Sequence, residues 1–179
     1  ARDETATLGA DYGFEPITLQ FAPGESEQSL PINIFTDGLD EDQETWSLLL
    51  TNAQNVRIPT SEITVSINDV DPEPTLFFSD LIVAEDSPIQ SRQVVVTLSE
   101  PAGRIVTALL SATDASAKAG EDFEPLRQTL TFPPGVTEQI AVLGILDDAL
   151  FEIPETLILT LSQVTNAQVA RRDSLVSIL

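Results

Sequence analysis

The sequence contains no cysteine, histidine or methionine, and it has only one tryptophan and one tyrosine among its 179 residues. Without thiolate and imidazole side chains, the chain cannot build the usual zinc sites, a cysteine nucleophile or a Ser-His-Asp triad. The metal ligands that remain are oxygen donors, above all carboxylates.

Basic residues are also scarce, since 8 lysines and arginines stand against 29 acidic residues and the formal net charge is −21. Nucleic acids and anionic membranes bind basic surfaces, so neither is an expected partner. No apolar run approaches the ~20 residues of a membrane-spanning helix, and no signal peptide or initiator methionine is present. We expect an excised or mature piece of a longer protein, without membrane insertion, whose partners include cations.

The chain repeats itself at the spacing that separates Asp11 from Asp122. In this register several positions coincide without a gap, among them Phe21/Phe132, Asp37/Asp148, Glu41/Glu152 and Glu44/Glu155. Such self-similarity indicates two copies of one domain. The segment "NDVDPEP", residues 68–74, separates the copies, because its two prolines disfavour helix on either side. The sequence predicts a first domain at 1–71 and a second at 72–179.

Each copy has the pattern of an all-β domain. In the second copy, short runs with period-2 alternation are separated by proline, glycine, asparagine and aspartate, and no long segment has a helical period. The seven expected strands are 76–86, 92–100, 104–114, 128–132, 138–146, 155–164 and 174–179. Seven strands are typical of an immunoglobulin-like β-sandwich. We therefore predict two tandem immunoglobulin-like β-sandwiches.

The first sandwich is expected to lack its N-terminal strands. The second copy starts near Thr75, and at the same spacing the first two strands of copy one and most of its third would precede residue 1. A sandwich without these strands exposes sheet edges that pair readily with other chains. The missing strands would lie upstream, or another chain would donate them.

The acidic residues follow the connections between strands. If successive strands alternate in direction, every second connection lies at the same end of the sandwich, and these connections are the acidic ones, whereas the opposite connections hold the arginines. Clustered carboxylates repel one another by about 1 kcal/mol per pair at 4 Å even in water. Calcium would offset this repulsion, because it takes 6–8 oxygen ligands from flexible loops, whereas magnesium prefers octahedral geometry and keeps its water.

Less specific interpretations exist for the same residues. A solvated acidic surface would explain the net charge, although not its confinement to alternate connections. Asp11 and Asp122, each before an aromatic residue, could be turn formers alone. Asp40 and Asp42 are predicted to be solvated, because Phe151 and Ile153 are their counterparts in the second copy.

Several motifs in order resemble the Calx-beta module, which is known from the regulatory loop of sodium/calcium exchangers, an integrin subunit and many large bacterial surface proteins. In the second copy they are "AGEDF", "TLTFPPG" and "ILDDALFEIPETLILTL"; in the first they are "LGADY", "LQFAPGE" and "IFTDGLDEDQETWSLLL". The resemblance covers nearly the whole chain. It implies a calcium-binding immunoglobulin-like sandwich with the ions at one end.

Carried over by position, the resemblance implies two sets of calcium ligands. The first set is Asp11, Asp37, Glu41, Glu44, Asp69 and Asp71, and the second is Glu85, Asp122, Asp147, Asp148, Glu152 and Glu155. One departure is that Thr36 stands where the second copy has Asp147. The first site is therefore expected to have one carboxylate fewer at this position.

Three functions remain open at this stage. The favoured one is a non-enzymatic, calcium-binding structural or adhesive module of a larger secreted or cell-surface repeat protein, in which calcium stiffens the tandem array and neighbouring repeats or other chains are partners. The first alternative is a cytosolic calcium-sensing domain of an exchanger-type membrane protein. The second is an enzyme that uses paired carboxylates, or an accessory domain of a larger extracellular enzyme; the acidic loops carry no aromatic platform for a sugar.

Overall fold

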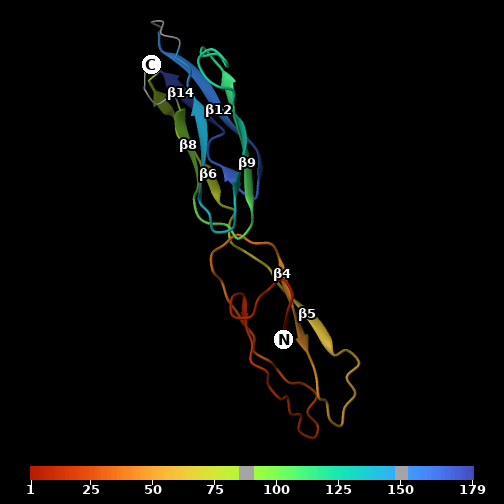
Figure 1. Ribbon diagram of the computed structural model, residues 1–179. Coiled ribbons are helices and arrows are strands. Elements are labelled where there is room, and N and C mark those ends of the chain that lie inside the picture. The colour runs from red at the N-terminus through yellow and green to blue at the C-terminus, as the bar shows by residue number, and fades with distance from the viewer. Residues whose placement is uncertain (85–90, 148–152) are drawn as a thin grey trace. The chain divides into compact units, whose positions relative to one another are not determined.

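The computed structural model describes residues 1–84, 91–147 and 153–179, and every regular element in these ranges is a β-strand (Figure 1). The chain divides into two compact units, Ala1–Asp71 (unit 1) and Pro72–Leu179 (unit 2). The described residues include no helix of the length and hydrophobicity needed to cross a bilayer.

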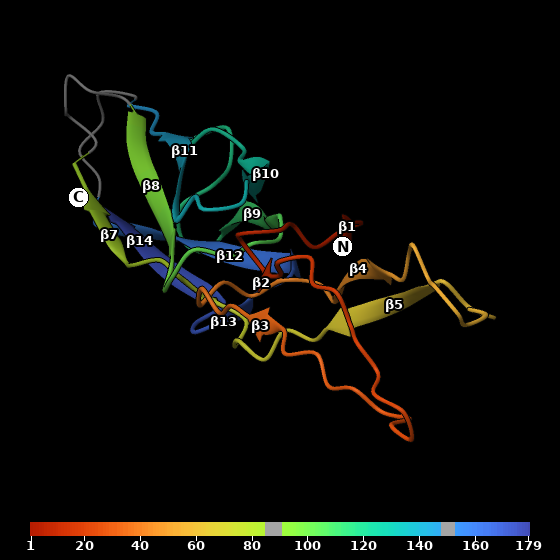
Figure 2. The same cartoon turned by 90° about the horizontal axis from the view of Figure 1, so that it is seen from below.

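Unit 2 is a sandwich of two sheets. Its strands are β6 (Thr75–Phe77), β7 (Leu81–Val83), β8 (Ser91–Leu98), β9 (Val106–Asp114), β10 (Arg127–Phe132), β11 (Glu138–Gly144), β12 (Glu155–Thr165), β13 (Gln168–Val169) and β14 (Asp173–Ile178). One sheet has the order β10-β9-β12-β14-β7 and the other the order β11-β8-β6-β13. Figure 2 shows β8 and β11 on one side of this unit and β7, β12 and β14 on the other.

The core of unit 2 lies between these sheets because alternate residues of each strand face inward. On β8 the inward residues are Val94, Val96 and Leu98, and on β12 they are Leu157, Leu159 and Leu161; none is more than 6% exposed. Each buried aliphatic side chain of this size stabilises the fold by about 2 kcal/mol.

The predicted first strand, 76–86, differs from the structure because it is divided. Its first part, β6, pairs antiparallel with β8, and its second part, β7, pairs parallel with β14 in the opposite sheet. The chain crosses between the sheets at residues 78–80, where Phe78 is buried. This crossing and the short β13 give nine strands in the described part of unit 2, so the prediction of seven was wrong in this detail.

Unit 1 has fewer and shorter strands: β1 (Arg2–Asp3), β2 (Tyr12–Gly13), β3 (Asn33–Ile34), β4 (Glu44–Leu49) and β5 (Glu62–Ile67). They form the sheet β1-β4-β5 and the pair β2-β3. Its core is small and aromatic. The rings of Tyr12 and Trp46 are fully buried and stack with their centroids 4.2 Å apart.

Residues 16–21 and 27–32 of unit 1 form no strand, although their counterparts lie in β10 and β11. In unit 2, β10 pairs with β9 and β11 pairs with β8. The described residues of unit 1 offer only the short β1 as a counterpart of β9 and none of β8. As a result Phe21 is 54% exposed, whereas its counterpart Phe132 is completely buried.

Candidate metal centre

The loops around Asp11 and Asp122 have the same structure in the two units. The backbone N–H of Thr7 donates to Oδ2 of Asp11 over 2.7 Å, and that of Lys118 donates to Oδ2 of Asp122 over 2.6 Å. Both aspartates therefore hold their loops, as the turn-forming interpretation states. A carboxylate has two oxygens and about four acceptor positions, so this role is compatible with metal binding.

Antiparallel pairing brings the acidic residues on either side of β4 and β5 together. Glu44 begins β4 and pairs with Ile67 at the end of β5, so Glu41 and Asp69 continue from the same edge of the sheet. There Oδ2 of Asp69 accepts a hydrogen bond from the N–H of Glu41 over 2.7 Å, and Oδ1 accepts one from the N–H of Asp71 over 3.0 Å.

A second pairing brings Asp37 to the same place. Tyr12 pairs with Ile34, and the N–H of Phe35 donates to the carbonyl oxygen of Asp11 over 2.9 Å, so the chain after β3 runs past Asp11. A cavity of about 70 Å³ lies at this point. It is lined by all six acidic residues predicted for the first copy: Asp11, Asp37, Glu41, Glu44, Asp69 and Asp71.

Three of these residues have the spacing of ligands to a single ion. One carboxylate oxygen from each of Asp11, Glu41 and Glu44 lies within 4.8 Å of the other two, and all three residues are half-buried. Calcium binds oxygen at about 2.4 Å, so two of its ligands can be at most about 4.8 Å apart. The donor set, three carboxylates with others on the same cavity wall, therefore fits a hard divalent cation.

The electrostatics of the cavity also favour a cation. Burial raises the pKa of Glu41, and the negative charges of four neighbours raise it further: Asp37, Asp11, Asp69 and Asp71. Burial likewise raises the pKa of Glu44, followed by repulsion from Asp11 and Glu41. A bound cation would relieve this repulsion and favour the charged form of both carboxylates.

The prediction that Asp40 is solvated is wrong, because this residue is only 6% exposed. Its counterpart in the second copy is Phe151, and an apolar residue at an equivalent position indicates burial more than exposure. Asp42 is exposed as predicted, but it lies on the wall of the cavity.

In unit 2 the structure describes three of the six predicted ligands. The N–H of Leu146 donates to the carbonyl oxygen of Asp122 over 3.0 Å. The exposed Asp147 therefore directly follows a residue that is hydrogen-bonded to the backbone of Asp122. Glu155 begins β12 and is half-buried. The other three, Glu85, Asp148 and Glu152, lie outside the described residues.

The sequence reasoning missed the aromatic pair beside the cavity of unit 1. Glu44 and Trp46 lie on the same side of β4, since they are two residues apart, and Trp46 stacks on Tyr12, which follows Asp11. The Tyr12 hydroxyl donates to Asp3 over 2.6 Å, and burial raises the pKa of Tyr12 to about 12. The two-residue spacing of Glu44 and Trp46 in an expected strand was the sequence signal that could have placed the tryptophan on the same face as the glutamate.

Comparison with known families identifies both halves of the chain. The family model described as the Calx-beta domain matches residues 1–71 and again residues 69–178. The chain therefore belongs to the Calx-beta family and contains two of its domains in tandem.

Curated relatives come from two settings. Extracellular matrix protein 3 of Lytechinus variegatus is 30% identical over 155 residues, which are 82% of this chain and 5% of the relative. Sodium/calcium exchanger 1 of Bos taurus is 23% identical over 194 residues, which are 97% of this chain and 20% of the exchanger. The chain thus spans a small part of each of these proteins.

A solved structure supports the fold. The crystal structure of the calcium binding domain CBD12 of CALX1.1 is 26% identical, with a TM-score of 0.53 over 58% of this chain and 44% of that chain. Together with the two packed sheets of unit 2, this similarity establishes an all-β, immunoglobulin-like sandwich architecture.

Proposed function

We propose that unit 1 binds calcium at Asp11, Glu41 and Glu44, with Asp37, Asp69 and Asp71 as further oxygen donors on the same cavity. The observation that carries this proposal is the convergence of six carboxylates on one small cavity, two of them with raised pKa values. The matching solved structure is itself named a calcium binding domain. In unit 2 we propose the ligands Glu85, Asp122, Asp147, Asp148, Glu152 and Glu155, of which Asp122, Asp148, Glu152 and Glu155 correspond to ligands of unit 1.

Calcium suits the unit 1 cavity better than magnesium. The acidic residues come from several connections of the chain, and the side chains of Asp11, Asp37 and Asp69 already accept backbone hydrogen bonds at 2.7 to 3.0 Å. Such a wall of carboxylates can supply many ligands at irregular angles, which calcium accepts. Magnesium requires near-octahedral ligands at shorter distances and releases its water reluctantly.

We further propose that this chain is a structural or adhesive part of a larger secreted or cell-surface protein and is not itself an enzyme. The similarity to an extracellular matrix protein supports this setting. Asp69 and Asp71 are among the last three residues before Pro72, so an ion that they bind would fix the end of unit 1 and stiffen the tandem array. Partners would then be neighbouring repeats, or other chains that donate strands to unit 1.

A second candidate is a cytosolic calcium-sensing domain of an exchanger-type membrane protein. The similarity to a sodium/calcium exchanger covers 97% of this chain and supports it. Affinity separates the two settings, because extracellular modules bind calcium with a Kd of about 10⁻⁴–10⁻³ M, whereas sensors bind at about 10⁻⁷–10⁻⁵ M. We expect a Kd in the weaker range.

The test is a calcium titration of the full chain followed by the fluorescence of Trp46. This is the sole tryptophan, and it is buried beside the proposed site in unit 1. Glu41→Gln should weaken binding by about tenfold or more, because it removes a charged ligand. Glu15→Gln is the matched control, since Glu15 is an exposed glutamate of unit 1 that does not line the cavity.

Magnesium and sodium chloride titrations complete this experiment. We expect a saturable change in Trp46 fluorescence with calcium and a much smaller change with magnesium. Calcium binding should be weakened in Glu41→Gln and retained in Glu15→Gln. Equal and weak responses to all three salts, or equal responses of both variants, would instead indicate a solvated acidic surface.

A further inference from the structure

The first and last segments of unit 2 run parallel to each other in both sheets. β6 pairs parallel with β13, and β7 pairs parallel with β14. Backbone hydrogen bonds continue beyond these strands, from the N–H of Gln168 to Pro74 over 2.9 Å and from the N–H of Leu179 to Val83 over 2.9 Å. Residues 74–83 therefore lie alongside residues 168–179.

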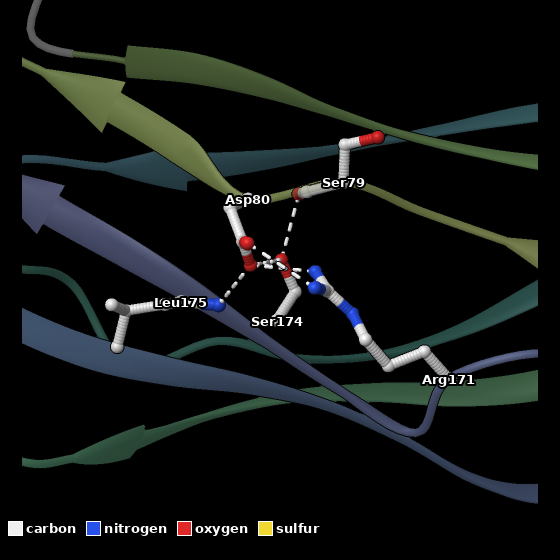
Figure 3. Close-up of polar contacts among 5 residues, drawn as sticks. All are labelled: Ser79, Asp80, Arg171, Ser174 and Leu175. Atoms are coloured by element: carbon white, nitrogen blue, oxygen red, sulfur yellow. Dashed lines mark hydrogen bonds and ion pairs between the residues drawn. The ribbon is translucent and has the colours of Figure 1, made fainter.

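This pairing is interrupted where the first segment crosses between the sheets, and side chains bridge the gap (Figure 3). Asp80 accepts a hydrogen bond from the N–H of Leu175 over 2.7 Å. The guanidinium of Arg171 contacts both carboxylate oxygens of Asp80, at 2.5 and 3.2 Å. The hydroxyl of Ser174 lies 2.7 Å from the carbonyl oxygen of Ser79 and 3.1 Å from Oδ1 of Asp80.

The direction of the two segments decides how they respond to force. Because they are parallel, the start of one and the end of the other lie at opposite ends of the pair. Tension that enters at the start of unit 2 and leaves at its end slides one segment along the other. All the hydrogen bonds then resist together, whereas pulling both segments from the same end would break them one after another.

We propose that these two segments form a mechanical clamp that allows unit 2 to transmit tension along the chain, with Asp80 joining the β6–β13 half of the clamp to the β7–β14 half. The bidentate contact with Arg171 is the geometry in which a charged pair is strongest and most directional. Asp80, Arg171 and Ser174 are not among the proposed calcium ligands, so these side-chain contacts of the clamp are distinct from the proposed calcium sites.

The first test compares two pulling directions on the same protein by single-molecule force spectroscopy. The full chain has no cysteine, so pairs of introduced thiols define the points of attachment. Handles at Pro72→Cys and Leu179→Cys slide the two segments, and handles at Ala84→Cys and Leu179→Cys peel them apart. The clamp requires a clearly higher unfolding force in the first geometry; equal forces in the two geometries would overturn it.

The second test asks whether Asp80 joins the two halves. In the sliding geometry, Asp80→Ala should unfold about tenfold faster at a fixed force, because hydrogen bonds to a charged group are lost. Asp173→Ala is the matched control: Asp173 accepts a hydrogen bond from Thr160 over 2.7 Å, between β12 and β14, and does not link the two terminal segments.

Arg171→Gln is a second variant in case Asp80→Ala does not fold, since it leaves the bond from Leu175 to Asp80 in place. It should also speed unfolding in the sliding geometry, to a smaller degree, and should have little effect in the peeling geometry. If the Asp80 and Arg171 variants match Asp173→Ala in both geometries, Asp80 has no special role and the proposed join between the two halves is wrong.

Discussion

Burial and neighbouring carboxylates both disfavour the charged forms of Glu41 and Glu44 in unit 1. Both are half-buried, and each is close to several other carboxylates. Unit charges of the same sign 4 Å apart repel by about 1 kcal/mol in water and more strongly near a protein surface. A calcium ion between them would convert this repulsion into attraction.

The raised pKa values predict an unusual pH dependence for the calcium-free protein. A carboxyl whose pKa is higher in the folded state binds more protons folded than unfolded, so stability falls as pH rises from about 4.5 through the raised values. Saturating calcium should abolish this fall, because it favours the ionised carboxylates. The measurement is the melting temperature of unit 1, followed by Trp46 fluorescence between pH 4 and 7, with calcium or with chelator.

The double variant Glu41→Gln/Glu44→Gln is the control for this prediction, and it should lose the fall above pH 4.5. Below that pH another residue acts in the opposite sense. Hydrogen bonds from Ser47 and Thr45 lower the pKa of Glu4, so the stability that Glu4 contributes is lost as pH falls below 4.5. A calcium-free protein whose stability rises steadily from pH 4.5 to 7 would contradict the electrostatic description of the cavity.

At the residue scale, residue type and spacing were enough to select candidate ligands. The six acidic residues of the first copy were identified from the repeat and the family resemblance, and the structure brings them to one cavity; their binding of calcium stays a prediction. The contact between Asp80 and Arg171 was out of reach, because the two residues are 91 positions apart and no local pattern relates them.

Among the elements, one equivalent cross-strand pair has a glycine in each unit, on opposite strands of the pair. Gly13 corresponds to Glu124, and Asn33 corresponds to Gly144. A Cβ on Gly13 would lie 2.9 Å from the ring of Phe35, and a Cβ on Gly144 would lie 2.5 Å from the carboxylate of Glu124. In unit 2 a side chain at position 144 would therefore collide with its cross-strand neighbour Glu124, whereas in unit 1 the obstacle is the ring of Phe35, because the Cβ of Asn33 is 3.5 Å away.

A double-mutant cycle tests this interpretation in unit 2. Gly144→Ala alone should lower the free energy of unfolding by about 1 kcal/mol, because its methyl group collides with Glu124. In the Glu124→Gly background the same change should be neutral or stabilising, since alanine loses less conformational entropy than glycine in a strand. The two effects are measured by urea unfolding of the full chain, and equal effects in both backgrounds would disprove the collision.

The strands themselves were predictable where alternation is regular and a pairing partner is present. β8 and β12 follow the expected periodicity, with every second residue buried from Val94 to Leu98 and from Leu157 to Leu161. The failures arise from tertiary structure. The strand predicted at 76–86 changes sheets at residues 78–80, and the counterparts of β10 and β11 in unit 1 have no neighbours with which to form a sheet.

At the scale of the whole molecule, the internal repeat gives the two units equivalent acidic loops. Equivalent hydrogen bonds hold the loops of Asp11 and Asp122, so the two units share one local design at the proposed calcium end. The design was readable from the sequence because the two copies match without a gap in this region. The setting of the parent protein is a separate matter, because the chain covers only 5% to 20% of the relatives compared.

The central claim, that an ion binds among the carboxylates of unit 1, is tested most directly by terbium luminescence. Terbium occupies calcium sites with oxygen ligands and emits when an excited aromatic residue lies nearby. The only tryptophan and the only tyrosine of the chain are Trp46 and Tyr12, which stack beside this cavity. Excitation of these residues in the full chain should therefore give terbium emission that calcium displaces, that Glu15→Gln retains and that Glu41→Gln/Glu44→Gln loses. Emission that is absent in the unmodified chain, or that persists unchanged in the double variant, would contradict a calcium site at this position.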